Sequence, residues 1–287
     1  MESSSVSGGQ LAAHVRAHLP GLRDAEARVA QVVLDQGADL PNLTIGDVAA
    51  LAGTAPSSVV RACQRLGFRG FQQLKLAAAR QAPRPDPTTE QDTAEQDPAV
   101  RALTDTLRAA REALDGLTAT LDAAELRAAA ELLGSASRVL VVGAGLSGAV
   151  ALDAAYRLRA LGCAVDAPAD PSTAQLAAGL LSPGAVCLAI SHTGASRTTV
   201  DAARLARGTG ADVIALTSTT HSPLSDLSSR TLVAGGQDLI LGLETVASRL
   251  AHLAVIDALA LTLLTLRGAS AEQALFLSAG ITADHLY

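Results

Sequence analysis

The sequence predicts an α-helical domain followed by a three-layer α/β domain built on a five-stranded parallel sheet. Up to residue 82, apolar residues recur at helical spacing between recognisable cap residues. A proline-rich acidic segment, 83–98, interrupts this pattern and is predicted to be a linker. From Val139 onwards, short apolar runs alternate with helical segments, as in parallel sheets covered by helices. We therefore expect domains at 1–82 and 99–287.

The net charge of −6 is distributed unevenly along the 287 residues. Residues 1–82 hold eight basic and six acidic side chains, and the remainder hold fourteen and twenty-two. A slightly basic first part on an acidic body favours nucleic-acid binding by the first part only. The first twenty residues lack the apolar core of a signal peptide.

Cysteine usage and hydropathy suggest a cytoplasmic protein. The cysteines have no C-x-x-C spacing and lie in apolar contexts, so we expect buried, reduced thiols at Cys63, Cys163 and Cys187. The most apolar run, Leu250 to Leu266, contains a histidine and an aspartate and is short for a membrane span. We expect it to form a helix buried at a subunit or domain contact.

Two helices are predicted to open the chain. One covers Gln10 to Leu19, and its His14 and His18 lie one turn apart. Because no third ligand is near, we expect surface histidines and no metal site. The other runs from an N-cap at Asp24 to about Gln36, with valines along one face.

Two shorter helices follow. Thr44 and Asp47 form a capping box that opens the first of them, and Gly53 suits the left-handed position that ends it. Pro56 suits the first turn of the second, which Gly67 ends. Two short helices joined by such a turn form the helix-turn-helix pattern, whose second helix enters the major groove of DNA.

Hydroxyl and basic side chains on and after this second helix are the candidate DNA contacts. Hydroxyls can bind phosphates or bases, and arginine can bind guanine edges or phosphates. The candidates are Ser57, Ser58, Arg61, Arg65, Arg69 and Lys75, the last being the only lysine in the chain. A small helical dimerisation or docking module remains the alternative.

The run from Leu43 to Leu76, LTIGDVAALAGTAPSSVVRACQRLGFRGFQQLKL, resembles the amino-terminal domain of RpiR-type transcriptional regulators. The resemblance rests on Ser-Val-Val-Arg followed by Leu-Gly-Phe-x-Gly-Phe-x-x-Leu-Lys. Ala62 stands where the family usually has an aromatic residue, and Ala55 replaces the usual serine cap. The resemblance implies that this domain binds operator DNA.

The α/β domain is predicted to begin with two helices, Val100 to Leu114 and Asp122 to Leu133. Five strands then alternate with helices and lead to a final helical region, Leu243 to Leu266. The predicted strands are Val139–Val142, Ala164–Ala167, Val186–Ile190, Val213–Thr217 and Thr231–Val233. In such sheets ligands bind at the carboxyl ends of the strands. The loops after the first and third strands are therefore the candidate site.

The first of these loops, Gly143 to Gly148, satisfies G-x-G-x-x-G between a strand and a helix. The unsatisfied N–H groups at a helix start bind anions, and glycine lets the backbone approach them closely. Asp166 lies eighteen residues further on, near the end of the second predicted strand. On its own this is the dinucleotide-binding fingerprint, with Asp166 on a ribose.

The loop after the third strand, SHTGAS, favours a different ligand. It places three hydroxyls, Ser191, Thr193 and Ser196, around Gly194 at a helix start. Hydroxyls and free N–H groups together suit a terminal phosphate, which a dinucleotide site does not need. The alternative is a hydroxyl-rich turn that only caps a helix.

Together the two loops resemble the sugar isomerase (SIS) domain, a fold that binds sugar phosphates. The resemblance covers about Leu132 to Val233, and Ser248 to Leu259 is similar to the carboxy-terminal helix of these regulators. Ala195 stands where many members have glutamate. The resemblance implies a phosphosugar site formed by Gly145, Ser147, Ser191, Thr193, Gly194 and Ser196. Glu244, at the start of the last predicted helix, is a further candidate contact to a sugar hydroxyl; the alternative is that it only favours the helix dipole.

Some SIS domains isomerise sugar phosphates, which requires a positioned base and usually an acid. The nearest candidates in the sequence are Glu244 and His192, and the region has no lysine. We therefore expect a sensor without catalytic residues or cofactor, which binds operator DNA and a phosphorylated sugar or amino sugar. A homodimer or higher oligomer that does not bind membranes is expected; an isomerase and an NAD(H)-sensing regulator remain the alternatives.

Overall fold

The computed structural model describes residues 8–79, 97–234 and 246–284, arranged in two compact units. One unit comprises residues 1–120 with 235–248, and the other comprises residues 121–234 with 249–287. The predicted linker lies almost wholly outside the described residues. Helix α6 (Pro98–Thr120) packs on α1 (Gly8–His18) and belongs to the first unit. The domain boundaries predicted from the sequence assign it to the second domain instead. The domain boundaries at 82 and 99 stay predictions.

The first unit is helical, and its local signals act as the sequence predicts. Thr44 and Asp47 bond reciprocally to each other's backbone, and Gly53 and Gly67 have φ of 57° and 81°. One cap differs, because Arg23 is the N-cap and Asp24 is the first helical residue. The remaining helices are α2 (Asp24–Gln36), α3 (Ile45–Leu51), α4 (Pro56–Arg65) and α5 (Phe71–Ala79), with 3-10 turns at Leu19–Gly21 and Gly37–Asn42.

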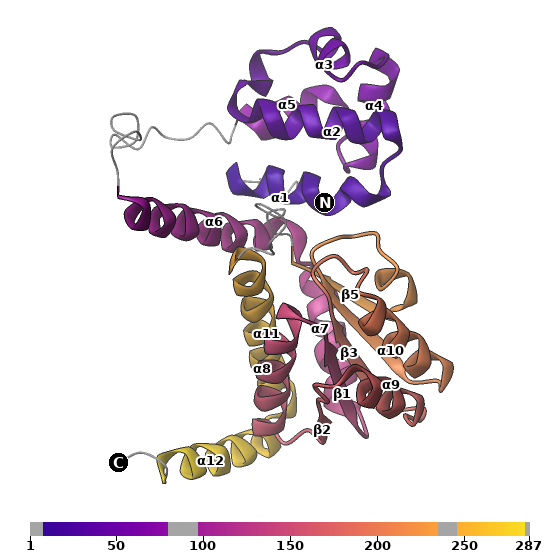
Figure 1. The fold of residues 1–287 in the computed structure, drawn as a ribbon, viewed down its shortest axis with the longest axis vertical. Coiled ribbons are helices and arrows are strands. Elements are labelled where there is room, and N and C mark those ends of the chain that lie inside the picture. Colours follow the sequence, from indigo (N-terminus) through magenta and orange to yellow (C-terminus); the bar gives the residue numbers. More distant parts are fainter. Residues whose placement is uncertain (1–7, 80–96, 235–245, 285–287) are drawn as a thin grey trace. The chain divides into compact units, whose positions relative to one another are not determined.

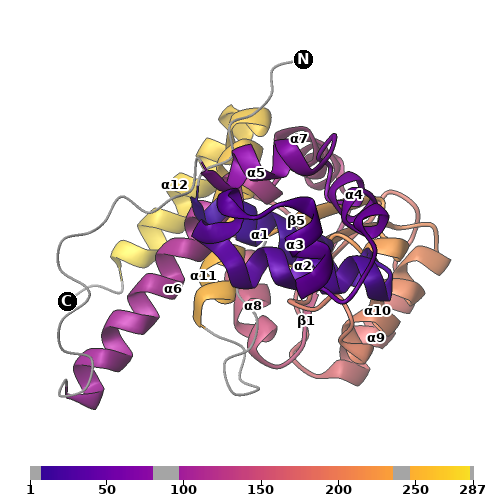
Figure 2. The ribbon, with the colours of Figure 1, turned by 90° about the horizontal axis from the view of Figure 1, so that it is seen from above.

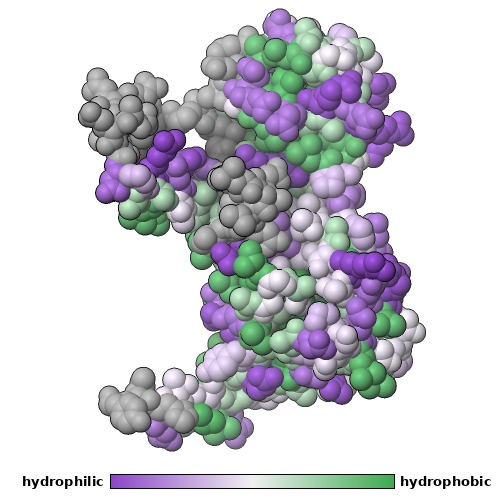
Figure 3. Space-filling model, viewed as in Figure 1, coloured by the Kyte–Doolittle hydropathy of each residue, from purple (hydrophilic) through white to green (hydrophobic). Residues whose placement is uncertain are grey.

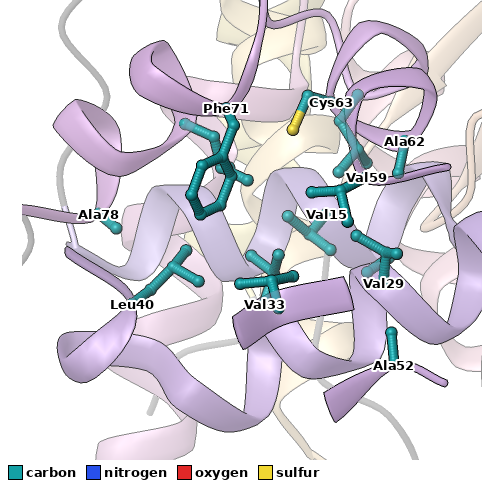
Figure 4. Close-up of a cluster of buried hydrophobic side chains, with 14 of the residues drawn as sticks. Val15, Val29, Val33, Leu40, Ala52, Val59, Ala62, Cys63, Phe71 and Ala78 are labelled. Atoms are coloured by element: carbon teal, nitrogen blue, oxygen red, sulfur yellow. The ribbon is translucent and has the colours of Figure 1, made fainter. Parts of the chain in front are cut away.

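One apolar core holds these helices together (Figure 4). Val15 of α1, Val33 of α2 and Val59 of α4 meet in it, and Phe71 covers it from the start of α5. Cys63 is buried in the same core, which raises the pKa of its thiol to about 11. Because one face of α4 is fixed in this core, its other face remains for contacts with a partner.

The second unit contains five parallel strands in the order β2-β1-β3-β4-β5, which confirms the predicted sheet. The strands are β1 (Val139–Gly143), β2 (Val165–Asp166), β3 (Val186–Ile190), β4 (Asp212–Thr217) and β5 (Arg230–Val233). The helices are α7 (Ala123–Ser135), α8 (Leu146–Ala160), α9 (Pro171–Gly179), α10 (Arg197–Gly208), α11 (Val246–Arg267) and α12 (Ala269–Ala283), with a 3-10 turn at Ser225–Leu227.

Helices cover both faces of the sheet, giving the predicted three layers. Helices α9 and α10 lie on one face, and α8 and α11 lie on the other (Figures 1 and 2). Alternate strand residues, such as Leu140 and Val142, pack in one buried cluster with alanines of α9 and α10. Gly134 of α7 lies against Leu263, which places α7 beside α11.

The carboxy-terminal part differs most from expectation. Helix α12 was not predicted, because its apolar residues follow no helical period. Several of them are exposed, up to 84% at Phe276, and apolar residues reach the surface along this helix (Figure 3). Among the described residues, 247–267 of α11 form the one helix long and apolar enough to cross a membrane by length and composition. That helix also packs in the unit, with Val255, Ile256 and Leu263 buried.

Candidate functional site

The strand order places the two candidate loops at the centre of the sheet edge. The chain moves outwards from β1 to β2 in one direction and from β3 to β4 in the other. Parallel sheets bind ligands at such a reversal point. Gly143 pairs with Ile190, and Ile190 pairs with Leu216, so the loops after β1, β3 and β4 start at one level.

The loop after β1 is shaped by close backbone packing. A Cβ on Gly143 would lie 2.6 Å from the carbonyl oxygen of Ser147, so only glycine fits there. Gly145 has φ of 59° and forms the N-cap of α8. Ser147 is buried in the first helical turn, where the helix dipole favours an anion.

Backbone N–H groups of the loop after β3 donate hydrogen bonds to hydroxyls of the same loop. The N–H of Ala195 donates to Oγ1 of Thr193 (3.2 Å), and that of Ser196 donates to Oγ of Ser191 (3.5 Å). Ser191 is 3% exposed, and Ser196 is the N-cap of α10. A hydroxyl that accepts from the loop backbone can still donate its own proton to a ligand oxygen. Both hydroxyls can therefore order the loop and bind an anion at once.

Residues at and after the end of β4 form the wall behind this loop, and they are not among the site residues predicted from the sequence. Gly194 has φ of 63°, and a Cβ there would lie within 3.0 Å of Ser222 and Thr217 side-chain atoms. The hydroxyl of Thr217 donates to the carbonyl of His192 (3.1 Å). The hydroxyl-rich run that directly follows a predicted strand was the available signal, since parallel strands end at one edge.

His192 points inwards, where its Nδ1 lies 2.8 Å from Oγ of Ser218. The same hydroxyl lies 3.1 Å from Nε2 of His252 on α11, and the two imidazole rings are 6.2 Å apart. All three residues are buried. Burial, with His192 nearby, lowers the pKa of His252 to about 3, so its ring is neutral at physiological pH.

Asp166 is not placed for the role that a dinucleotide would require. It pairs with Leu140, three residues before the end of β1, and its carboxylate contacts Arg138 at 3.2 Å. A ribose-binding carboxylate needs to lie level with the carboxyl end of β1, where the glycine-rich loop begins. Asp166 is the last residue of the short strand β2, but it lies level with the start of β1. The structure therefore separates Asp166 from the glycine-rich loop.

The candidate DNA contacts lie mainly on the outer face of α4. Ser57, Arg61 and Arg65 are exposed there, whereas Ser58 is buried and its hydroxyl accepts from Nη2 of Arg61 at 2.9 Å. Arg69 is exposed beyond the helix end. In the structure Ser58 thus orients Arg61 and does not lie on the exposed face.

Two further side chains brace this helix-turn-helix region. Lys75 donates to the carbonyl of Leu43 (2.8 Å) and lies over the ring of Phe71, so its ammonium group also serves the fold. His14, expected to be a surface histidine, is half-buried, and its Nε2 lies 2.7 Å from the carbonyl oxygen of Leu66 at the end of α4. Its partner is 52 residues away, which spacing along one helix does not reveal.

The remaining candidate, Glu244, lies outside the described residues. Within the described ranges, no group of three or more His, Cys, Asp or Glu side chains could hold a metal ion. All three cysteines are free; Cys63 and Cys187 are buried, while Cys163 is partly exposed and contacts Arg267.

A helix-turn-helix unit and a parallel α/β unit with hydroxyl-lined loops define the class, and comparisons with known proteins agree. The model for the helix-turn-helix domain of the rpiR family matches residues 9–83, and that for the SIS domain matches residues 132–262. The HTH-type transcriptional regulator HexR of Pseudomonas aeruginosa is 31% identical over 258 residues, 88% of each chain. The chain belongs to the RpiR family of helix-turn-helix transcriptional regulators.

Solved structures extend this comparison. The Vibrio vulnificus NanR protein, solved in complex with ManNAc-6P, is 25% identical with a TM-score of 0.62, covering 96% of this chain and 99% of that one. A putative sugar-phosphate isomerase from Listeria monocytogenes is similar with a TM-score of 0.57 at 18% identity, covering 64% of this chain and 98% of that one. At that identity the second likeness shows the fold alone.

Proposed function

We propose that the loops after β1 and β3 bind a phosphorylated sugar or amino sugar, which controls operator binding by the helix-turn-helix unit. The observation that carries this is the pair of loops at the reversal point, with Ser147 buried in the first turn of α8 and Ser191 buried directly after β3. Their hydroxyls, with those of Thr193 and Ser196, supply several donors to one dianion. The ManNAc-6P bound to NanR is a ligand of this chemical class.

A thermal-shift screen of the full chain tests the ligand class. The panel holds hexose, pentose and amino-sugar phosphates, their unphosphorylated parents and NAD(H). A ligand that binds only the folded state raises the melting temperature by mass action. We expect stabilisation by one sugar phosphate and not by its parent sugar. Stabilisation by NAD(H) alone would instead favour the dinucleotide alternative.

Ser191→Ala combined with Thr193→Ala tests the residues. The double variant removes two donors, so the sugar phosphate found in the screen should no longer alter DNA binding. DNA binding without ligand should persist, because the substitutions lie in the other unit. An unchanged ligand response would show that the phosphate binds elsewhere. The sign of the response follows from which arrangement of the DNA-binding units the ligand favours.

We further propose that the site senses its ligand and does not isomerise it, and that the protein acts in the cytoplasm, where its DNA is. Isomerisation needs a base and an acid at the sugar carbons. The Nδ1 atom of His192 already contacts Ser218, and relatives such as HexR are named as regulators. Incubation with the stabilising sugar phosphate should leave it unconverted, as followed by ¹H NMR.

The regulator is proposed to act as a homodimer, since helix-turn-helix proteins commonly bind two half-sites. One groove would be covered by a second copy of the chain. It is lined by exposed side chains that include Tyr156 of α8, Leu261 of α11 and Leu275 of α12. Leu261→Asp should yield monomers in sedimentation experiments. Leu180→Asp is the matched control, because Leu180 is equally exposed and lies outside the groove. Monomeric wild-type protein would refute the assignment.

A further inference from the structure

A buried polar chain links three elements behind the candidate phosphate loop. His192 follows β3, Ser218 follows β4, and His252 lies on α11. The hydroxyl of Ser218 lies between the two imidazoles, at 2.8 Å from one and 3.1 Å from the other. Ser218 and His252 are 5% and 2% exposed, and the direct phosphate contacts proposed above include neither. Burying polar groups this deeply costs free energy unless each is hydrogen-bonded. The burial of these three hydrogen-bonded side chains therefore needs an explanation.

The hydroxyl couples the two histidines because it has one proton to give. If Ser218 donates to Nδ1 of His192, then Nε2 of His252 must carry a proton and donate to Ser218. If Nδ1 of His192 carries the proton and the hydroxyl donates to Nε2 of His252, both bonds reverse. Since the hydroxyl can donate to only one of the two rings, at least one of the two facing nitrogens must carry a proton, and both rings are held in orientation.

Backbone hydrogen bonds join the same two segments as these side chains do. The carbonyl of His192 accepts from the N–H of Ser218 at 2.9 Å, and the N–H of Ser191 donates to the carbonyl of Leu216 at 3.0 Å. The start of the phosphate loop is thus anchored to the end of β4 through both backbone and side chain. His252 adds α11 to this anchor, one helical turn after Ser248, where the chain passes from the first unit to the second.

We propose that Ser218 and His252 are positioning residues for the effector site. Acting through His192, they hold the Ser191–Ser196 loop in its anion-binding form and connect it to α11. This inference rests on the proposed function of that loop as the phosphate site. A substitution at either position should therefore change phosphate affinity, although neither side chain is proposed to touch the phosphate.

Nitrogen-15 NMR of the histidine side chains in the full-length protein tests the coupling directly. In the wild type, we expect His192 and His252 each to show a single tautomer, assigned with His192→Gln and His252→Gln. In Ser218→Ala the His192 ring nitrogens should move towards the averaged shifts of a mixed tautomer. Unchanged shifts in Ser218→Ala would overturn the proposal, since the shared hydroxyl would then not set the tautomer.

Titration with inorganic phosphate, followed by calorimetry, tests the consequence. Ser218→Ala and His252→Leu should each weaken binding about tenfold, as expected for losing a buried hydrogen bond. His252→Gln should restore affinity close to wild type, because its amide can either donate to the Ser218 hydroxyl or accept from it. Ser229→Ala is the control, since Ser229 bonds Asp212 at the opposite edge of the sheet.

The outcomes separate this inference from the proposed function. If the wild type binds phosphate and all the variants bind equally well, the positioning role is refuted while the phosphate site stands. If His252→Leu and His252→Gln weaken binding equally, the contact is one of packing, and the role is also refuted. If the wild type binds neither inorganic phosphate nor any sugar phosphate, the proposed function fails and this inference fails with it.

Discussion

The α4 side chains that are proposed to contact DNA and the hydroxyls of the loop after β3 are held by the fold in opposite ways. Arg61 and Arg65 extend from a helix whose other face is already buried, so they can change without disturbing the core. Ser191 is buried, and its hydroxyl also accepts from the loop backbone. The proposed operator contacts are therefore separable from folding, whereas the proposed effector contacts would serve folding and binding together.

The largest expected effect is at Gly194. In Gly194→Ala the new Cβ would collide with the Ser222 side chain and occupy a positive-φ position. We expect a loss of about 3 kcal/mol in the free energy of unfolding, measured by urea denaturation. Gly208→Ala is the control, since nothing lies within 4 Å of its Cβ position, and it should be neutral or slightly stabilising. Equal stability of the two variants would show that the loop adapts freely.

The second effect depends on pH and on His252. Its pKa is about 3 in the folded protein and near 6.5 in the unfolded chain, so between these values only the unfolded chain binds the proton. Stability should therefore fall as the pH drops below about 6.5, by about 1.4 kcal/mol per pH unit and about 2 kcal/mol by pH 5. His252→Gln should lack this component, whereas exposed His221→Gln should keep it. Parallel urea midpoints from pH 7 to 5 for all three proteins measure the difference.

The same contrast explains what the sequence could predict. The helix-turn-helix caps and the SHTGAS hydroxyls are local signals, because Thr44 bonds Asp47 and Ser191 bonds Ser196 within a few residues. The bonds of His14 to Leu66 and of Ser218 to His252 span 52 and 34 residues, and no periodicity reveals them. Helix α12 was not predicted from the sequence, because its apolar residues surround the helix and so lack the one-sided spacing of a packed helix.

A smaller effect is expected at the DNA surface. Arg61→Ala should weaken binding to DNA selected from a random pool about tenfold, or about 1.4 kcal/mol, because one base or phosphate contact is lost. The unfolding free energy should change by less than about 0.5 kcal/mol, since the side chain is exposed. Arg197→Ala, which removes an exposed arginine of the second unit, should leave DNA affinity unchanged. If Arg61→Ala instead unfolded the first unit, the proposed separation of binding from folding would be wrong.

The smallest effect lies at His14, which is half-buried in the first unit. Its Nε2 lies 2.7 Å from the carbonyl oxygen of Leu66 at the end of α4, so it positions α4 without being on the proposed DNA-facing surface. His14→Ala should cost about 1 kcal/mol of stability and weaken DNA binding a few-fold, because the end of α4 loses a hydrogen bond. His14→Gln should recover most of both, since an amide can donate to the same oxygen. His18→Ala is the comparison, because Nδ1 of His18 lies 2.8 Å from the carbonyl oxygen of His14, within α1. Equal losses in His14→Ala and His18→Ala, by urea denaturation and DNA titration, would mean that α1 as a whole and not the bond to Leu66 sets the position of α4.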